Sequence, residues 1–243
     1  MIREAIILAG GLGTRLRSAV PDLPKCMAPV GGRPFIAYLT DYFRAGGIEK
    51  FIFALGYKSG HFDDFLRSEL PQGSYEVSLE DEPLGTGGAI QQACRLAMDP
   101  TVLVLNGDTF FGIRLDELSA FHDAREADCS LCLRPMRDFD RFGVVELGED
   151  QRVLDFREKQ HYAAGLINGG VYALNRQRFL NEGLPEKFSF EKDWLEAFYT
   201  RRRFFGLVQD SYFIDIGIPE DYERVQEEVQ MITSIKNNHD IQK

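Results

Sequence analysis

A glycine-rich segment near the N-terminus is the first part of the chain whose residue types suit chemistry. An apolar run leads directly into Gly10, Gly11 and Gly13, which are followed by Thr14 and Arg15. Glycines after a strand permit positive φ and gather backbone N–H groups around one point, which suits a polyphosphate. A dinucleotide-binding fingerprint would need glycine at position 16, and a P-loop would end in Gly-Lys-Ser/Thr. The segment indicates a different phosphate-binding loop, with a plain strand-to-loop turn as the alternative.

Two cations accompany this loop. Arg15 lies within it, and Lys25 follows Pro24, whose ring stiffens the chain just before the lysine. The formal net charge is −10, so a triphosphate must meet a local group of positive charges or a metal ion. We expect Arg15 and Lys25 beside the phosphates, although either one alone would more often be an ordinary solvated side chain.

Two aspartates are the predicted metal ligands. Asp108 follows an apolar run, and Asp215 follows another run just before Gly217 and Pro219. Ligands of open α/β sheets bind at the carboxyl ends of the strands, and Mg²⁺ takes one or two protein carboxylates together with phosphates and water. The pair therefore predicts Mg²⁺ as the cofactor. A turn or a helix N-cap is the alternative for each aspartate, most seriously for Asp215, which precedes a predicted helix.

Composition and cysteine usage exclude several classes of protein. The acidic balance disfavours a nucleic-acid partner, and no apolar run approaches the roughly 18 residues of a membrane span. The N-terminal segment lacks the pattern of a signal peptide. Cys129 and Cys132 are three residues apart on a predicted strand, so they should point to opposite faces and pack in the core. With Cys26 and Cys94 they form no disulfide framework, and a reduced, cytoplasmic setting is expected.

The elements that must position these residues alternate between strands and helices. The alternation predicts a mostly parallel sheet with helices on both faces, in one domain spanning residues 1–243. Strands are predicted at 5–9, 50–55, 75–80, 101–105, 128–133, 142–146, 153–158 and 167–174. Helices are predicted at 34–45, 61–66, 88–98, 115–124, 190–199 and 219–232. The polar tail from Asn237 is expected to fray.

Five segments, taken together and in this order, resemble the sugar-phosphate nucleotidyltransferase family. They are Leu8–Leu16, Pro24-Lys25, Leu84–Ala89, Asn106–Asp108 and Asp215–Pro219. The resemblance implies a GT-A-like three-layer α/β/α sandwich with a mixed, mostly parallel sheet. It also implies a reaction in which a nucleoside triphosphate and a sugar 1-phosphate give a nucleotide sugar and pyrophosphate, with Mg²⁺ bound.

The resemblance further implies roles for individual residues. Catalysis is assigned to Arg15, Lys25 and Asp108, with Arg15 on the departing pyrophosphate and Lys25 on the α-phosphate. Asp108 and Asp215 would hold the metal. The implied nucleotide-binding residues are Leu8, Ala9, Gly10, Gly11, Gly13, Thr14, Arg15, Lys25, Glu80, Gly85, Thr86 and Asp108. The implied sugar-phosphate-binding residues are Gly143, Glu158, Lys159 and Asn168, with Gln160 where the family has proline. A surface charge pair is the alternative for Glu158 and Lys159.

Glu80 is the residue expected to select the base. It lies five residues before Gly85, where many thymidylyl- and uridylyltransferases of the family have glutamine. A carboxylate only accepts hydrogen bonds, which suits the N1–H and N2–H₂ donors of guanine and favours GTP. A solvated residue at the end of a strand is the alternative.

The resemblance is closest to the subgroup that acts on D-glycero-α-D-manno-heptose 1-phosphate, which implies GDP-heptose as the product. Segments 80–90, 106–111, 138–143, 165–170 and 187–191 carry it. A mannose- or glucose-1-phosphate nucleotidyltransferase using GTP, UTP or dTTP stays open. So do a non-catalytic regulatory subunit that binds nucleotide sugars and a metal-dependent glycosyltransferase. The sequence also leaves homo-oligomer formation open.

Overall fold

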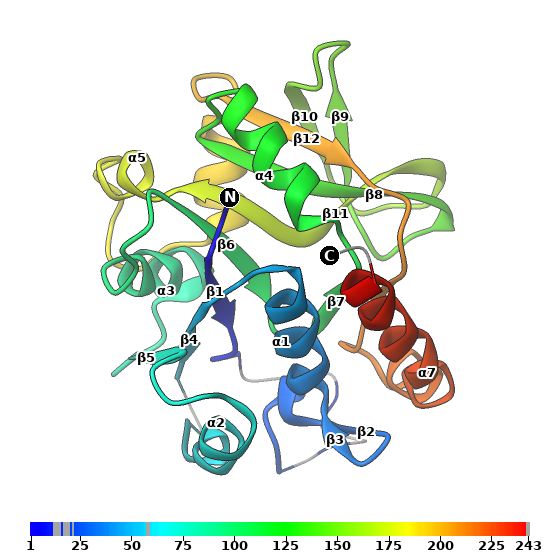
Figure 1. The fold of residues 1–243 in the computed structure, drawn as a ribbon. Helices are drawn as coiled ribbons and strands as arrows, with labels where there is room; N and C mark the ends of the chain where they lie inside the picture. The colour runs from blue at the N-terminus through cyan, green and yellow to red at the C-terminus, as the bar shows by residue number, and fades with distance from the viewer. Residues whose placement is uncertain (12–15, 17–19, 21, 57–58, 242–243) are drawn as a thin grey trace.

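The computed structural model describes the chain except for residues 12–15, 17–19, 21, 57–58 and 242–243. Beyond residue 235 it describes only the backbone. A nine-stranded sheet lies at its centre (Figure 1). Its strands are β1 (Glu4–Leu8), β4 (Lys50–Leu55), β5 (Tyr75–Leu79), β6 (Thr101–Asn106), β8 (Cys129–Phe139), β9 (Val144–Leu147), β10 (Val153–Arg157), β11 (Tyr162–Asn175) and β12 (Phe204–Val208). Their spatial order is β10-β9-β11-β6-β1-β4-β5, with β8 between β11 and β12.

The sheet is mixed, with most strands running in one direction. β6, β1, β4 and β5 pair in parallel, as do β8 and β12. β11 pairs antiparallel with β6, β8 and β9, and β10 pairs antiparallel with β9. Only β11 and β10 therefore oppose the others within this sheet of the described chain, which confirms the mixed, mostly parallel sheet that was expected.

Helices cover both faces of the sheet (Figure 1). One buried cluster includes side chains of α1 (Phe35–Gly46), α2 (Asp63–Glu69), α4 (Leu115–Ala124) and α7 (Pro219–Ile241). The other includes side chains of α3 (Gly85–Cys94), α5 (Arg176–Leu180) and the π-helical segment η3 (Phe190–Leu195). Successive strand residues alternate between the clusters, as Ile6 and Ile7 do, because side chains of a strand point to alternate faces. The result is the predicted three-layer sandwich.

The cysteines follow the same alternation. Cys129 belongs to one cluster and Cys132 to the other, and both are fully buried. All four cysteines are unpaired. The prediction that this C-x-x-C pair packs in the core is confirmed.

Short elements complete the chain. They are the strands β2 (Pro29–Val30), β3 (Arg33–Pro34), β7 (Thr109–Phe111) and β13 (Phe213–Asp215), the 3-10 turns η1 (Lys25–Met27) and η2 (Ser59–Phe62), and the single helical turn α6 (Glu196–Phe198). β7 pairs antiparallel with β13, and β2 with β3. None of these strands was predicted, because two or three residues are too few to show a period.

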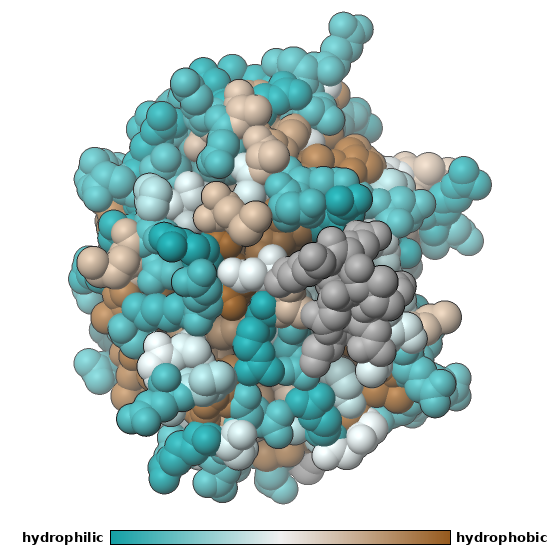
Figure 2. All heavy atoms as spheres, viewed as in Figure 1, coloured by the Kyte–Doolittle hydropathy of each residue, from teal (hydrophilic) through white to brown (hydrophobic). Residues whose placement is uncertain are grey.

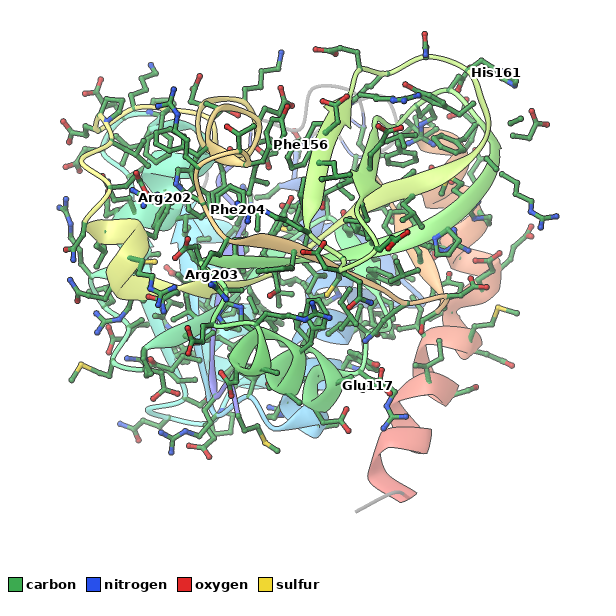
Figure 3. The ribbon with its side chains drawn as sticks, turned by 90° about the horizontal axis from the view of Figure 1, so that it is seen from above. Glu117, Phe156, His161, Arg202, Arg203 and Phe204 are labelled. Carbon is green, nitrogen blue, oxygen red and sulfur yellow. The ribbon has the colours of Figure 1, made fainter. Side chains whose placement is uncertain are left out.

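Several predicted boundaries differ from the structure. β4 and α4 have the predicted bounds, but β8 and β11 extend well beyond theirs. Their added parts pair with each other, as Tyr162 does with Phe139, through backbone hydrogen bonds that require no apolar pattern. The arm they form carries His161 at its outer end, on the opposite side of the molecule from Arg202 and Arg203 (Figure 3).

Two helix predictions were wrong in detail. The predicted helix 190–199 is π-helical over Phe190–Leu195 and only then one α-helical turn. α7 continues to Ile241 instead of ending at Ile232, so the backbone is helical where fraying was predicted. After Pro219 no glycine or proline interrupts the helix, and Val225 and Ile232 anchor it in the core.

Hydrophilic side chains cover most of the face shown in Figure 2, and hydrophobic side chains lie between them. This agrees with the formal net charge of −10. Among the helices of the described residues, none combines the length and the apolar character that crossing a bilayer requires.

Candidate active site

The first cavity, of about 840 Å³, lies at the carboxyl ends of β1 and β6. After β1 the chain continues to β4 and β5 on one side of β1, and then crosses back to β6 on the other side, so the strand order reverses at β1. Such a point in an open α/β sheet creates a crevice where ligands bind. Leu8 lies opposite both Ala54 and Asn106 in this register, and all three line the cavity.

Most predicted nucleotide-binding residues line this cavity. They are Leu8, Ala9, Gly10, Gly11, Lys25, Glu80, Gly85, Thr86 and Asp108. The remaining three, Gly13, Thr14 and Arg15, lie outside the described residues. Folding thus gathers segments that are far apart in the sequence around one space large enough for a nucleotide.

A second cavity, of about 580 Å³, adjoins the first. Asn106 and Glu191 line both. All four predicted sugar-phosphate-binding residues, Gly143, Glu158, Lys159 and Asn168, line the second cavity. Asp215 lines it too. Glu158 and Lys159 are exposed, but they lie on the wall of a cavity and not on an open surface.

The two aspartates meet where the cavities meet. β13 places Asp215 opposite Thr109 of β7, next to Asp108, and the Ile216 N–H donates to the Asp108 carbonyl at 3.0 Å. Lys25 occupies the turn η1 and donates from Nζ to Asp108 Oδ2 at 3.4 Å. This ion pair is partly exposed, with 22% of the Lys25 and 31% of the Asp108 side chain accessible. A cation and two carboxylates therefore share one region.

The electrostatics of Asp215 suit a bound cation. Burial raises the pKa of Asp215, and the nearby negative charge of Asp108 raises it further. The Gly217 N–H, which donates to Asp215 Oδ1 at 2.8 Å, opposes this shift, as do the charges of Arg141 and Lys25. The turn role considered for Asp215 is thus present, and it uses one oxygen. A divalent cation beside both carboxylates would relieve their repulsion.

The donor set fits Mg²⁺ shared with a substrate. Among the described residues, no group of three or more histidine, cysteine or acidic side chains is arranged to hold a metal by itself. A pair of aspartates therefore needs phosphate oxygens and water to complete an octahedron, which is how Mg²⁺ usually binds.

Glu80 is built into the wall of the first cavity. Its Oε2 accepts from the Leu84 N–H at 2.9 Å, and a Cβ added to Gly10 would lie 2.9 Å from Oε1. The side chain is half-buried, with one carboxylate oxygen hydrogen-bonded to the backbone. One carboxylate oxygen fixes the turn before α3, and the other faces the glycine loop.

The start of α3 is fastened to the segment before η3. Gly85 has φ of +74°, and a Cβ there would lie 2.5 Å from the Phe188 carbonyl oxygen, so only glycine fits. Thr86 Oγ1 donates to Glu191 Oε2 at 2.7 Å and accepts from the Phe190 N–H at 2.9 Å. Because a threonine hydroxyl has one proton, Thr86 can offer a nucleotide only its remaining lone pair.

The wall of the second cavity is equally constrained. A Cβ on Gly143 would lie 2.4 Å from the Arg157 carbonyl oxygen, which explains the glycine. Asn168 Nδ2 donates to the Tyr172 hydroxyl at 2.8 Å, and its Oδ1 accepts from the Gly170 N–H at 3.1 Å. These bonds stabilise an irregularity of β11 between Asn168 and Tyr172. Each amide end of Asn168 keeps one further hydrogen-bonding site.

Sequence reasoning missed Glu191 and Arg141. Glu191 lies in a segment cited for the resemblance, yet only folding brings it between the two cavities. Arg141 pairs with Asp221 at the start of α7, and its charge acts on Asp215. A polar residue inside an aromatic run was the available signal for Glu191. Arg141 had none.

The described residues that line the cavities include no histidine. Fold and site together define an α/β protein with Gly10 and Gly11 following its first strand, a pair of neighbouring carboxylates and two adjoining cavities. This arrangement suits a reaction that joins two substrates at the carboxylates.

Known proteins are similar to this chain over nearly its whole length. Residues 4–231 match the family model described as nucleotidyl transferase. The chain belongs to this family. It is 46% identical over 227 residues to the D-glycero-alpha-D-manno-heptose 1-phosphate guanylyltransferase of Aneurinibacillus thermoaerophilus, covering 93% of this chain and 98% of that one. Identity to the enzyme of the same name from Campylobacter jejuni is 43%, covering 90% and 96%.

A solved structure is also similar. HddC from Yersinia pseudotuberculosis, complexed with GMP-PN, superposes with a TM-score of 0.81 at 35% identity. The match covers 94% of this chain and all of that one. The fold expected from the sequence is therefore confirmed by the sheet topology and by this relative.

Proposed function

We propose that this protein transfers GMP from GTP to D-glycero-α-D-manno-heptose 1-phosphate, giving GDP-heptose and pyrophosphate. The observation that carries the proposal is the pair of adjoining cavities that meet at Asp108, Asp215 and Lys25. Two relatives of similar length carry this activity in their names, and a similar structure is complexed with GMP-PN.

The proposed chemistry is an in-line displacement at the α-phosphorus of GTP. An oxygen of the sugar phosphate forms the new P–O bond, while the bond from the α-phosphorus to the bridging oxygen breaks and pyrophosphate leaves. A phosphate monoester is anionic near pH 7, so the attack needs no general base. This agrees with cavity walls that, over their described residues, contain no histidine. Catalysis then consists of positioning and charge neutralisation.

Individual residues have distinct proposed tasks. Lys25 would neutralise charge at the α-phosphate, and Arg15 would do so at the pyrophosphate. Asp108 and Asp215 would hold Mg²⁺, which supplies positive charge to the phosphates when bound. In the second cavity, Lys159 would bind the sugar phosphate, while Gly143, Glu158 and Asn168 would bind the sugar hydroxyls. The positions of Gly143, Glu158, Lys159 and Asn168 on the wall of the second cavity support the sugar-phosphate part of this division.

Base selection is assigned to Glu80. One of its oxygens is bound to the Leu84 N–H, and the other faces the first cavity beside Gly10. We propose that this second oxygen accepts from the N1–H and N2–H₂ groups of guanine. We place the enzyme in the cytoplasm, which the four unpaired cysteines support.

The proposal is tested by pyrophosphate release from a matrix of substrates. GTP, UTP, dTTP, ATP and CTP are each combined with the 1-phosphates of heptose, mannose and glucose, with Mg²⁺ and with EDTA. We expect the highest kcat/KM for GTP with heptose 1-phosphate, and no turnover in EDTA. Turnover with UTP and glucose 1-phosphate but not with GTP would contradict the proposal. Nucleotide-sugar binding without turnover of any pair would indicate a regulatory subunit.

A further inference from the structure

Two side chains, Asn106 and Glu191, are shared by the walls of both cavities. The Asn106 amide packs closely against Gly170, where an added Cβ would lie 2.6 Å from its nitrogen. Glu191 has no task in the proposed reaction. Its position at the junction raises the question of what its carboxylate binds.

Glu191 is carried by an unusual helical segment. η3 is π-helical over six residues, and π-helical turns are rare and often occur at functional sites. Phe190, Trp194 and Leu195 of η3 are buried in the core cluster below it. With these apolar anchors in the core, the segment leaves Glu191 on the cavity side.

The carboxylate of Glu191 is held on one side only. Its Oε2 accepts from Thr86 Oγ1 at 2.7 Å and from Ser189 Oγ at 3.2 Å. Oε1 has no hydrogen-bond partner among the described residues. An ionised carboxylate can only accept hydrogen bonds, so Oε1 is a negatively charged hydrogen-bond acceptor held in a fixed position. It suits a hydroxyl donor and repels a phosphate.

The surroundings of Glu191 indicate which substrate supplies the hydroxyl. Its neighbours Ser189, Lys192, Leu195 and Glu196 line the second cavity and are not part of the described wall of the first. The segment therefore belongs to the second cavity, and only Glu191 reaches the junction. The second cavity is the one that contains the proposed sugar-phosphate residues.

We infer that Glu191 is a sugar-binding residue, whose Oε1 accepts a hydrogen bond from a hydroxyl of the sugar 1-phosphate. The inference rests on the proposed function and adds a residue that the resemblance did not include. Thr86 and Ser189 hold the carboxylate in the orientation that this contact needs. This contact would hold the sugar 1-phosphate at the junction, with its attacking phosphate oxygen beside the α-phosphorus of GTP.

The test is the Glu191→Gln variant, measured as the full chain with Mg²⁺. Glutamine has nearly the same shape and keeps an acceptor for Thr86, but it removes the negative charge. With its single oxygen accepting from Thr86, glutamine places an NH₂ donor where Oε1 stood, so the sugar hydroxyl loses its acceptor and we expect the KM for heptose 1-phosphate to rise by roughly tenfold. The KM for GTP should stay within about twofold. Glu186→Gln, an exposed position outside the described walls of both cavities, is the matched control.

Other outcomes are equally informative. A rise in the KM for GTP with an unchanged KM for the sugar phosphate would overturn the inference and assign Glu191 to the ribose. Unchanged values of both in an active protein would also overturn it, and would leave the proposed function intact. A wild-type protein inactive on every substrate pair would overturn both. If E191Q does not melt cooperatively, Glu191→Asp, which withdraws the carboxylate, should raise the same KM.

Discussion

At the scale of single residues, the site depends on charges that folding brings together. Lys25, Asp108 and Asp215 come from three distant segments, and they meet through a turn, a strand end and a short antiparallel pair. Burial raises the pKa of Asp215, and repulsion between its charge and that of Asp108 raises it further. Such a pair is unfavourable for stability alone and becomes useful with a cation.

The first prediction concerns Asp108. Asp108→Asn removes the charge of one proposed metal ligand while keeping the shape of the side chain. We expect turnover to fall by at least roughly 100-fold, while nucleotide binding without metal changes little. Initial rates of pyrophosphate release and equilibrium titration with GTP in EDTA measure the two effects. Asp210→Asn, at an exposed position outside the described cavity walls, is the control. Wild-type turnover by D108N would refute the metal assignment.

The second prediction concerns Glu80. Glu80→Gln keeps an acceptor for the Leu84 N–H but replaces a charged acceptor by an amide. We expect kcat/KM for GTP to fall by roughly tenfold and the preference to move toward UTP or dTTP. Inosine triphosphate lacks the N2 amino group and serves as the internal control. Wild type should prefer GTP over it, and E80Q should largely lose that preference. An identical preference in both proteins would sink the assignment of Glu80 to the base.

At the scale of elements, the close contact between α3 and the segment before η3 positions the site. Gly87 donates its N–H to the Phe188 carbonyl at 3.0 Å, and the Phe188 N–H donates to the Leu84 carbonyl at 3.0 Å. Two further glycines, Gly85 and Gly88, let the backbones approach. The glycines of this motif therefore serve helix packing as well as the nucleotide cavity.

The third prediction tests this contact through Gly85→Ala. The variant combines an unfavourable positive φ with a Cβ only 2.5 Å from the Phe188 carbonyl oxygen. Gly183 has nearly the same φ, +72° against +74°, and open space around it. Gly183→Ala should cost about 1 kcal/mol, and Gly85→Ala roughly 2 kcal/mol more. Denaturant unfolding gives both values. Equal losses of unfolding free energy in the two variants would show that the positive φ, and not the close approach to Phe188, causes the loss.

A second contact between elements holds the segment that carries Lys25. Gln226 of α7 donates from Nε2 to the Pro29 carbonyl at 2.8 Å and accepts the Gly31 N–H at 3.2 Å. Tyr222 donates to the same Pro29 carbonyl at 2.6 Å. The last helix thus fixes the β2–β3 turn, which follows η1 directly.

At the scale of the whole molecule, the free energy of unfolding depends on pH through one buried histidine, His122. This histidine of α4 is buried between the helix and β8, with Nδ1 2.9 Å from Ser130 Oγ and no partner at Nε2. Burial lowers the pKa of His122 to about 4. The unfolded chain would protonate this residue at an ordinary pKa near 6.5.

The fourth prediction follows from that difference. Below pH 6.5 the unfolded state binds a proton that the folded state does not, so acid destabilises the fold until the pH approaches 4. We expect the free energy of unfolding to fall by about 2 kcal/mol from this residue between pH 7 and pH 5. Urea unfolding at several pH values measures the slope. His122→Gln should flatten it, and an unchanged slope in that variant would refute the role of His122.

Much of this protein was predictable from local sequence because local physics decides it. Alternation of apolar residues specifies which strand side chains enter which core, and Cys129 and Cys132 follow that rule. Glycines and aspartates at strand ends predict a phosphate and metal site, since open α/β sheets bind ligands at those ends. Short pairs such as β7 with β13, and the outer parts of β8 and β11, show no local signal because only their partners define them.

The glycine-rich segment, the two separate candidate aspartates and the fold class could thus be predicted from the sequence itself. What the tertiary structure alone decided is which side chains share a wall. It placed Glu191 between the cavities, directed the hydrogen bond of the Thr86 hydroxyl to that carboxylate, and set Asp215 beside Asp108. The physical reason is that contact between distant segments depends on register and packing, which no spacing along the chain encodes.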